Sequence, residues 1–422
     1  MKKTSLLFYS LIFVIGLIAS CSKNDLLTSS INNSNDNNIV ADKAPVKLPT
    51  IAIIDPFAAV KIAFGNNIDP VNLLNYANQI KPNYINKDNA RGNNITNPKA
   101  TLGRVLFYDK NLSTTNTISC SSCHKQNFAF SDTALISNGV VGGLTVRHSM
   151  RLINTRFANE SKFFWNERAI TLEQQTTMPI QDHLEMGFSG LNGRGNMASL
   201  LSKLSKINYY KELFKFVYGD TIVTEPRLQE TLAQFVRSIQ SFDSKYDIGR
   251  AQVNNDNDPF LNFSVVENTG KRLFLTPPVF NQNGIRIAGG LGCNGCHNAP
   301  EFDIDPNSRN NGIIGIIGST ALELNDTRAP SLRDLTKTDG SLNSRMMHNG
   351  VFNSLRAVMG HYNNIPNNPR NTNLDGRLKP NNNGQQLNLT TEETDAVIAF
   401  MRTLSGTLVY TDKKWASPFV NQ

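Results

Sequence analysis

Two short cysteine–histidine strings are the residues of this chain best suited to redox chemistry. They read CSSCH at 120–124 and CNGCH at 293–297, about 170 residues apart. Both have the C-x-x-C-H spacing typical of covalent haem attachment, in which two thiols bond to the haem and the adjacent histidine binds its iron. The pattern therefore predicts two haems c. Their attachment residues and iron ligands would be Cys120, Cys123, His124, Cys293, Cys296 and His297.

Other uses of paired cysteines explain these strings less well. A structural zinc site needs four protein ligands, and each string offers one histidine besides its thiols. A thioredoxin-like pair or a short disulfide does not require a histidine directly after the second cysteine. The chain has five cysteines, and four of them lie in the two strings.

The first 50 residues predict export and anchoring. Two lysines precede an apolar run over residues 6–19, which is too short for a stable membrane span. The run ends in IASC, which resembles a bacterial lipobox, so we expect a signal peptide over 1–20 and a lipid on Cys21. Ordinary secretion is the alternative. Residues 21–50 are polar and predict a flexible tether. We therefore expect a lipid-anchored protein on the periplasmic side of the cell envelope, where c-type haems are attached.

Composition limits the partners of the chain. It has 422 residues, 39% hydrophobic and 18% charged, which is typical of a soluble protein with two or three domains. The formal net charge is +8, and the propionates of two haems would lower it. No run of basic residues stands out, so we expect no nucleic-acid partner.

The elements that must position the haems are mainly helices. Over Thr224–Phe242 the apolar residues recur every three or four positions, and Thr224 with Pro226 forms a start signal. Residues 390–404 begin with a capping box, and Gly406 follows as an expected C-cap. Asp69–Ile80 also has helical spacing.

Ser354–Tyr362 is a further expected helix, followed by an Asn-, Pro- and Gly-rich loop over 363–386. Strand signals are scarce. The fold class is therefore mainly α, with long connecting loops.

Four ordered segments together resemble the bacterial di-haem cytochrome c peroxidase/MauG family, over about residues 95–410. They are Leu102–Asp132, Phe163–Gly187, Gly290–Phe302 and Arg328–Asn363. The resemblance implies two cytochrome c-like domains with long connecting loops. We expect a peroxide-reactive haem domain over 51–255 and an electron-transfer haem domain over 256–422, whose last helix could pack back on the first domain.

The resemblance also implies the residues of the peroxide pocket. Glu185 matches the family's catalytic glutamate and Gln175 its distal glutamine, while Pro179 matches a pocket wall. Splitting H2O2 requires a base that takes a proton from one oxygen and returns it to the other, and a carboxylate can do both. Trp165 matches a tryptophan that relays electrons between the haems. The next two residues, Asn166 and Glu167, depart from the family's W-D-G-R.

Other departures concern the first haem and calcium. In oxidised peroxidases of the family a histidine ligates the first haem, and the matching position here is Val140. We therefore expect the iron of this haem to be open, or water-ligated, without prior reduction. His148 aligns with an asparagine that helps bind Ca²⁺ in relatives, and the other matched region, 343–345, differs too. The resemblance leaves calcium open.

The second haem's other iron ligand is expected from the helix that ends at Tyr362. Tyr362 stands at the ligand position, where relatives have Met or Tyr, and Met359 lies one turn away on the same face. His361 points elsewhere, and His348 matches a histidine near this haem. A tyrosine favours ferric iron, whereas a thioether raises the reduction potential.

These residues imply three functions. The first is a peroxidase that reduces H2O2 with electrons from a small cytochrome c or a copper protein. The second is a MauG-like oxidase acting on a protein or organic substrate. The third, a plain di-haem electron carrier, would need no Glu185.

Overall fold

The structure, a computed structural model, describes residues 55–159 and 162–421. The predicted signal peptide, the tether and Cys21 lie outside these residues. Within them the fold is mainly helical, which confirms the expected fold class. The α-helices are α1 (Ala58–Phe64), α2 (Asn97–Tyr108), α3 (Cys120–Cys123), α4 (Leu172–Gln181), α5 (Met197–Leu204), α6 (Asn208–Tyr218), α7 (Glu225–Ser238), α8 (Lys245–Arg250), α9 (Val265–Leu275), α10 (Leu355–Asn363) and α11 (Thr391–Arg402).

The strands are short and form two antiparallel pairs. They are β1 (Pro278–Phe280) with β2 (Arg286–Gly289) and β3 (His297–Asn298) with β4 (Asp303–Ile304). Short 3-10 helices lie in the connections. They are η1 (Gly65–Asn67), η2 (Lys110–Leu112), η3 (Gln126–Phe128), η4 (Val140–Gly142), η5 (Cys293–Gly295), η6 (Gly376–Leu378), η7 (Pro380–Asn382) and η8 (Leu408–Tyr410).

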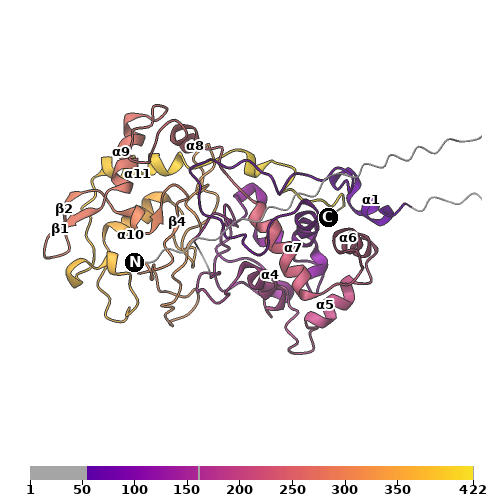
Figure 1. Cartoon of the computed structure of the whole chain (residues 1–422). Coiled ribbons are helices and arrows are strands. Elements are labelled where there is room, and N and C mark those ends of the chain that lie inside the picture. The colour runs from indigo at the N-terminus through magenta and orange to yellow at the C-terminus, as the bar shows by residue number, and fades with distance from the viewer. Residues whose placement is uncertain (1–54, 160–161, 422) are drawn as a thin grey trace, which may run out of the picture. The chain divides into compact units, whose positions relative to one another are not determined.

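The first hydrophobic core is built around α7, which packs against α2 and α4 (Figure 1). The apolar stripe predicted for α7 is buried, including Leu228, Leu232 and Phe235. Gly103 of α2 lies so close to α7 that a Cβ there would be 2.0 Å from the carbonyl oxygen of Thr231. The glycine therefore permits a helix contact that any side chain would block.

The second hydrophobic core is built in a similar way around α9 and α11. Here a Cβ on Gly270 would lie 1.8 Å from the carbonyl oxygen of Ala396. In each half of the chain, a helix that precedes the C-x-x-C-H string thus meets a later helix through a glycine. This shared contact agrees with two half-similar haem regions.

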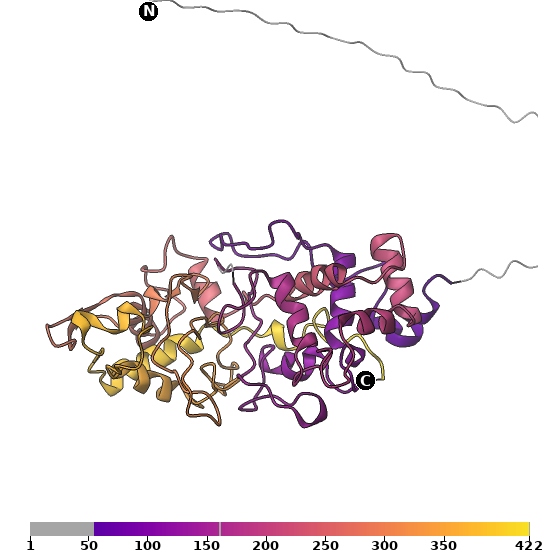
Figure 2. The same ribbon diagram turned by 90° about the horizontal axis from the view of Figure 1, so that it is seen from below.

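The chain returns to its first half after α11. The short helix η8 and Trp415 join the first core, and the Trp415 indole N–H donates to the carbonyl of Ser238. Figure 2 shows the yellow C-terminal segment among the indigo and magenta elements. Tyr246 belongs to the second core although it precedes residue 256. The predicted boundary between residues 255 and 256 remains a prediction.

Three sequence-predicted helices are present. α7 begins after Thr224, whose side chain accepts a hydrogen bond from the N–H of Arg227. The Thr390–Glu393 capping box opens α11, and Ser354 caps α10.

Two local predictions are wrong. Residues 69–80 form turns, because Asp69 and Asn75 accept hydrogen bonds from nearby backbone N–H groups that a helix would need. Gly406 is not the C-cap of α11, which ends at Arg402 with Thr403 as its C-cap. Instead the N–H of Gly406 donates to the carboxylate of Asp334, at a point too close to Asp243 for a side chain.

Candidate haem sites and peroxide pocket

The first C-x-x-C-H string forms one helical turn. Ser119 and Ser122 make a capping box at the start of α3, which carries both thiols. His124 follows at its C-terminal end, with Nδ1 3.1 Å from the carbonyl oxygen of Phe130. Burial lowers the pKa of His124, so its ring is held neutral. With Nδ1–H donating to Phe130, Nε2 keeps a lone pair for a metal.

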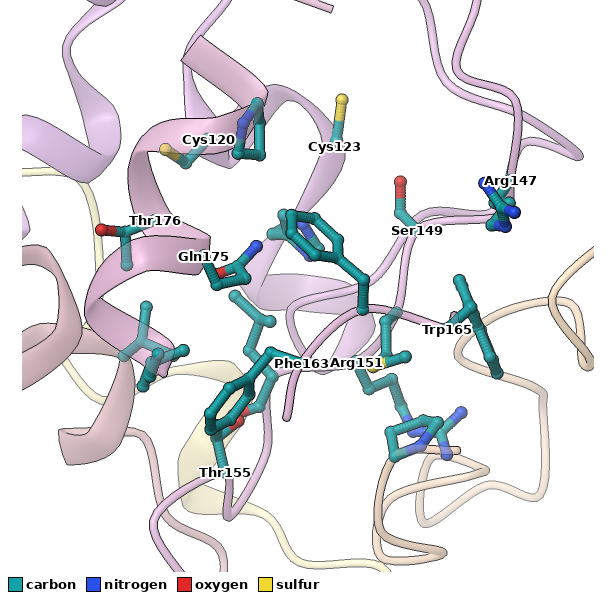
Figure 3. A pocket seen from close by; sticks show the side chains of 18 of the residues that line it. Cys120, Cys123, Arg147, Ser149, Arg151, Thr155, Phe163, Trp165, Gln175 and Thr176 are labelled. Carbon is teal, nitrogen blue, oxygen red and sulfur yellow. The ribbon is translucent and has the colours of Figure 1, made fainter. Parts of the chain in front are cut away.

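A cavity of about 180 Å³ adjoins this turn. Its walls include Cys120, Cys123 and His124, together with residues from α4 and from the loop that follows it. In Figure 3 the two cysteines lie at the top, Gln175 and Thr176 come from α4, and Trp165 lies to the right. The structure thus brings the residues predicted for the peroxide pocket, Gln175, Pro179, Glu185 and Trp165, around the cavity that the first haem-attachment string lines.

Glu185 is held by the turn after α4. The backbone N–H groups of Leu184 and Glu185 both donate to the side chain of Asp182, at 2.8 and 3.0 Å. Burial and the Asp182 carboxylate raise the pKa of Glu185 to about 7, against the opposing effects of Arg168 and Arg147. A carboxyl group with this pKa can gain and lose a proton near neutral pH, as an acid–base catalyst must.

The peroxide reaction is expected to slow as the pH falls below about 7. Protonated Glu185 cannot accept a proton, so below this pKa the active fraction falls about tenfold per pH unit, to about 1% at pH 5. Above the pKa the rate should level off. Initial rates of the reaction with H2O2 between pH 5 and 8 test this. A flat profile over that range would contradict the role of Glu185 as base.

Val140 supports the same turn. It is 1% exposed, and its N–H donates to the carbonyl groups of both Leu184 and Glu185, at 3.1 and 3.0 Å. η4, which begins at Val140, is thus tied to the backbone of Glu185. At the position where the resemblance expects a histidine ligand, the chain therefore has a buried apolar residue bonded to the turn that carries Glu185.

The second C-x-x-C-H string has a different local structure. η5 follows Gly292, whose φ of 70° suits glycine, and His297 begins β3. Burial and the positive charges of Arg151 and Arg377 lower the pKa of His297 to about 4. Its Nδ1 is buried without a hydrogen-bond partner among the described residues. The ring is therefore neutral, as an iron ligand must be.

A larger cavity of about 470 Å³ adjoins this string. Four residues of α10 line it in the predicted one-face pattern: Leu355, Val358, Met359 and Tyr362. His361 instead faces the carbonyl oxygen of Asn311, with Nε2 2.9 Å from it. Both predicted ligand candidates, Tyr362 and Met359, thus line the cavity with His297.

Sequence reasoning missed Met347 and Asn311 in this cavity. The side-chain amide of Asn311 donates to the Tyr362 hydroxyl at 3.0 Å and contacts the Met347 sulfur at 3.2 Å. A signal for Met347 existed, because it directly precedes His348 in the string MMHNG. Asn311 lies in an Asn-rich loop that carries no pattern pointing to a site.

The two cavities share a wall. Trp165, His148 and Arg151 line both of them. The Trp165 indole N–H donates to the carbonyl of His148 at 2.8 Å, and its ring centroid is 6.3 Å from that of His348. The N–H of His148 donates in turn to the carbonyl of His348 at 2.7 Å. Trp165 is thus fixed by backbone contacts that connect the two halves of the chain.

The turn after Trp165 contains a left-handed residue, Glu167. Its φ of 56° is a conformation that glycine adopts freely, and the family pattern has Gly at this position. The Glu167 carboxylate accepts a hydrogen bond from the Thr327 hydroxyl at 2.7 Å and faces Arg328. The departure from W-D-G-R therefore adds a polar contact to the second half of the chain.

The residues present fit two covalently attached haems. All four string cysteines are free thiols, and both string histidines are neutral. Arg151 is buried in the shared wall, its Nε has no partner, and it makes no ion pair with any described residue. An isolated buried cation is costly unless an anion pairs with it. Haem propionates would supply that anion.

Replacing Arg151 by Leu is expected to lower the reduction potential of a neighbouring haem. Removing a positive charge stabilises the ferric form, by an amount on the order of 1 kcal/mol. Arg151→Lys, which keeps the charge, is the matched control. Redox titration of both variants measures the effect. Equal potentials in the Leu variant and the wild type would contradict the pairing of Arg151 with a propionate.

The calcium site that the resemblance left open stays a prediction, and Oδ1 of Asn343 in one matched region is buried without a hydrogen-bond partner among the described residues. Ca²⁺ takes oxygen ligands, whereas His148 stands at one matched position. The nearby carboxylates of Asp326 and Glu323 are both engaged by Arg147, at 2.9 and 3.1 Å. No group of three or more His, Cys, Asp or Glu residues suited to a metal occurs in the part of the chain that the structure describes.

Comparisons with known proteins agree with this geometry. The family described as "Di-haem cytochrome c peroxidase" matches residues 97–255. Methylamine utilization protein MauG of Methylophilus methylotrophus is 28% identical over 74% of this chain and 84% of its own length. Cytochrome c551 peroxidase of Nitrosomonas europaea is 26% identical over 73% of this chain and 80% of its own length.

A solved structure is similar over most of the chain. It is a MauG-like protein associated with microbial copper homeostasis, with 26% identity and a TM-score of 0.61. The alignment covers 81% of this chain and 99% of that protein. Residues 97–255 thus match the di-haem cytochrome c peroxidase family, and most of the chain is similar to MauG and to cytochrome c peroxidases, which are oxidoreductases.

Proposed function

We propose that this protein is a di-haem c-type peroxidase that reduces H2O2 to water with electrons from a small redox protein. One observation carries the proposal: Glu185 and Gln175 line the same cavity as the haem-attachment residues Cys120, Cys123 and His124. A carrier that only passes electrons would not need a carboxyl group with a pKa of about 7 in that cavity.

Cys120, Cys123 and His124 would hold a haem, whose iron would supply the redox chemistry of peroxide cleavage. Glu185 accepts a proton from one peroxide oxygen and delivers it to the other, which leaves as water. Gln175 is neutral, so it can orient peroxide by hydrogen bonding without competing for that proton. Leu172 is 2% exposed and forms part of the apolar wall that limits entry of bulk water. Two electrons and two protons per H2O2 complete the reduction to two water molecules.

Electrons enter through the second site and cross the shared wall. His297 and Tyr362 line the second cavity, and we infer that Tyr362 rather than Met359 is the second iron ligand. The hydrogen bond from Asn311 favours Tyr362, because it stabilises negative charge on the phenol oxygen. Trp165, which lines both cavities, is the inferred relay.

A MauG-like oxidase is the second candidate. A tyrosine ligand favours ferric and more oxidised iron, which suits oxidation of a protein or organic substrate better than storage of an electron. The similarity to MauG over 74% of this chain supports this alternative as well. Reduced donor proteins distinguish the two functions, because only the peroxidase consumes them rapidly.

We infer that the protein lies on the periplasmic side of the cell envelope, held by a lipid on Cys21. The apolar run and the IASC string support this placement. Among residues 55–159 and 162–421, no helix has the length and apolar character required of a membrane span.

Donor oxidation under multiple turnover tests the peroxidase function. The oxidised di-haem protein is mixed with H2O2 and an excess of reduced cytochrome c or reduced copper protein. Stoichiometric oxidation of at least one donor, two electrons per peroxide, is the expected result. Failure of both donors, with oxidation of another substrate instead, would favour the MauG-like alternative.

A further inference from the structure

The second cavity holds two atoms that could each face a haem iron, and one side chain contacts both. The amide nitrogen of Asn311 is 3.0 Å from the hydroxyl oxygen of Tyr362 and 3.2 Å from the sulfur of Met347. All three residues line the cavity that contains His297. An amide nitrogen carries two hydrogens, so it can donate to both atoms at once.

The orientation of the Asn311 amide is fixed by its own loop. Its side-chain oxygen accepts the backbone N–H of Ile313 at 3.1 Å, which identifies the oxygen end and turns the nitrogen toward the cavity. The backbone carbonyl of Asn311 faces Nε2 of His361 at 2.9 Å. The ring of His361 packs edge-on against Tyr362, with centroids 5.1 Å apart. The Ile313 N–H and His361 therefore hold Asn311 and Tyr362 in position relative to each other.

Met347 reaches the cavity through an unusual backbone conformation. Its φ is 71°, a left-handed value that costs energy for a residue with a side chain. The carbonyl of Met347 accepts the N–H of Gly350 at 3.0 Å, which closes the turn. The surrounding turn thus maintains a thioether beside Tyr362, and sequence reasoning had considered only the thioether of Met359.

We propose that Asn311 is a positioning residue that selects the Tyr362 oxygen over the Met347 sulfur as the second iron ligand. The proposal rests on the assignment of Tyr362 made under the proposed function. A hydrogen bond strengthens with the charge on its acceptor, so the amide favours an anionic phenol oxygen. A thioether sulfur is a weak acceptor and gains little. The same amide also holds the Met347 sulfur beside the Tyr362 oxygen, so that the sulfur does not occupy the position of the iron ligand.

Ligand spectroscopy of Asn311→Leu tests the selection. Leu keeps the approximate volume but cannot donate. We expect the oxidised variant to lose the charge-transfer absorption of a tyrosine-bound ferric haem, gain that of a methionine-bound haem, and show a higher reduction potential. Asn311→Asp keeps the shape and can accept the Ile313 N–H, but presents an acceptor to Tyr362. It should lose the tyrosine signature too. Loss in both variants would show that a packing defect of the Leu variant is not the cause.

Two further substitutions sharpen the result. Adding Met347→Leu to Asn311→Leu should abolish the methionine signature, whereas adding Met359→Leu should not. Asn349→Leu is the matched control, because Asn349 donates to the Gly315 carbonyl and is not among the residues that line the cavity. It should keep the wild-type spectrum. Retention of the tyrosine signature in both Asn311 variants, or its absence from the wild type, would overturn the selection by Asn311.

The reaction of the first site with H2O2 separates this proposal from the proposed function. The rate with H2O2 is therefore measured on the wild type and on the Asn349→Leu control, whose residue lines neither cavity, and the two rates should agree. A wild type that shows the tyrosine signature but does not react with peroxide would refute the peroxidase function alone. A protein that reacts with peroxide but keeps the tyrosine signature in both Asn311 variants would refute the selection by Asn311 alone.

Discussion

Glu185→Gln is expected to lower the rate of the reaction with H2O2 by about 10²–10⁴-fold, the usual contribution of a general acid–base residue. Both haems should remain attached, because Glu185 is not one of the cysteines or histidines of the two C-x-x-C-H strings. Glutamine keeps the size and polarity of the side chain but cannot accept the peroxide proton. The backbone bonds that shape the turn, from Leu184 and Glu185 to Asp182, do not involve the substituted carboxyl group.

Stopped-flow rates at a pH above 7, where the wild-type rate has levelled off, measure this loss. The haem content per chain verifies that both haems are attached. Glu392→Gln is the matched control, because Glu392 is exposed in the first turn of α11. It should react at the wild-type rate. A Glu185→Gln protein that is fully loaded and reacts as fast as the wild type would remove Glu185 from the mechanism.

Replacing Cys293 and Cys296 together by Ser is expected to abolish steady-state peroxide reduction with donor proteins. Without these thiols the second haem has no covalent attachment, so the chain should carry one haem by mass spectrometry. The first cavity and Glu185 remain, so one round of reaction with H2O2 should persist. The expected signature is therefore a single turnover without sustained donor oxidation.

The mirror variant, Cys120→Ser with Cys123→Ser, provides the comparison. It should also carry one haem, but it should lose even the single reaction with peroxide, because its remaining haem lies in the cavity without Glu185. Sustained donor oxidation by the Cys293/Cys296 variant would show that electrons do not enter through the second site.

Much of the local structure was predictable because its signals lie within a few residues. The start of α7 depends on Thr224 and its burial on a regular apolar stripe, and both are present in the structure. The capping box of α11 depends on Thr390 and Glu393, three positions apart. The helix predicted over 69–80 was wrong because apolar spacing does not reveal side chains, such as those of Asp69 and Asn75, that compete for the backbone N–H groups. Val71 and Ile80 are 84% and 92% exposed and only Tyr76 of the segment is buried, so no continuous apolar face packs to compensate for that competition.

The first site was largely predictable because each of its parts lies in a recognisable motif. Glu185, Gln175 and Trp165 line the expected cavity, while their catalytic roles remain predictions. The second site was less predictable from the sequence. Asn311 reaches Tyr362 across 51 positions of sequence, and no local pattern reports such a contact. Arg151 is similar, because the lack of a hydrogen-bond partner for its buried Nε among the described residues is visible only after folding.

The most direct test of the account is rapid mixing of the fully oxidised di-haem protein with H2O2 in the absence of any reductant. Val140 stands where the resemblance expects a blocking histidine, and the cavity beside His124 contains Glu185 with a pKa of about 7. We therefore predict an immediate spectral change whose rate rises with peroxide concentration. No reaction until one haem has been reduced would contradict the account, because it would mean that another ligand closes the first haem in the oxidised protein.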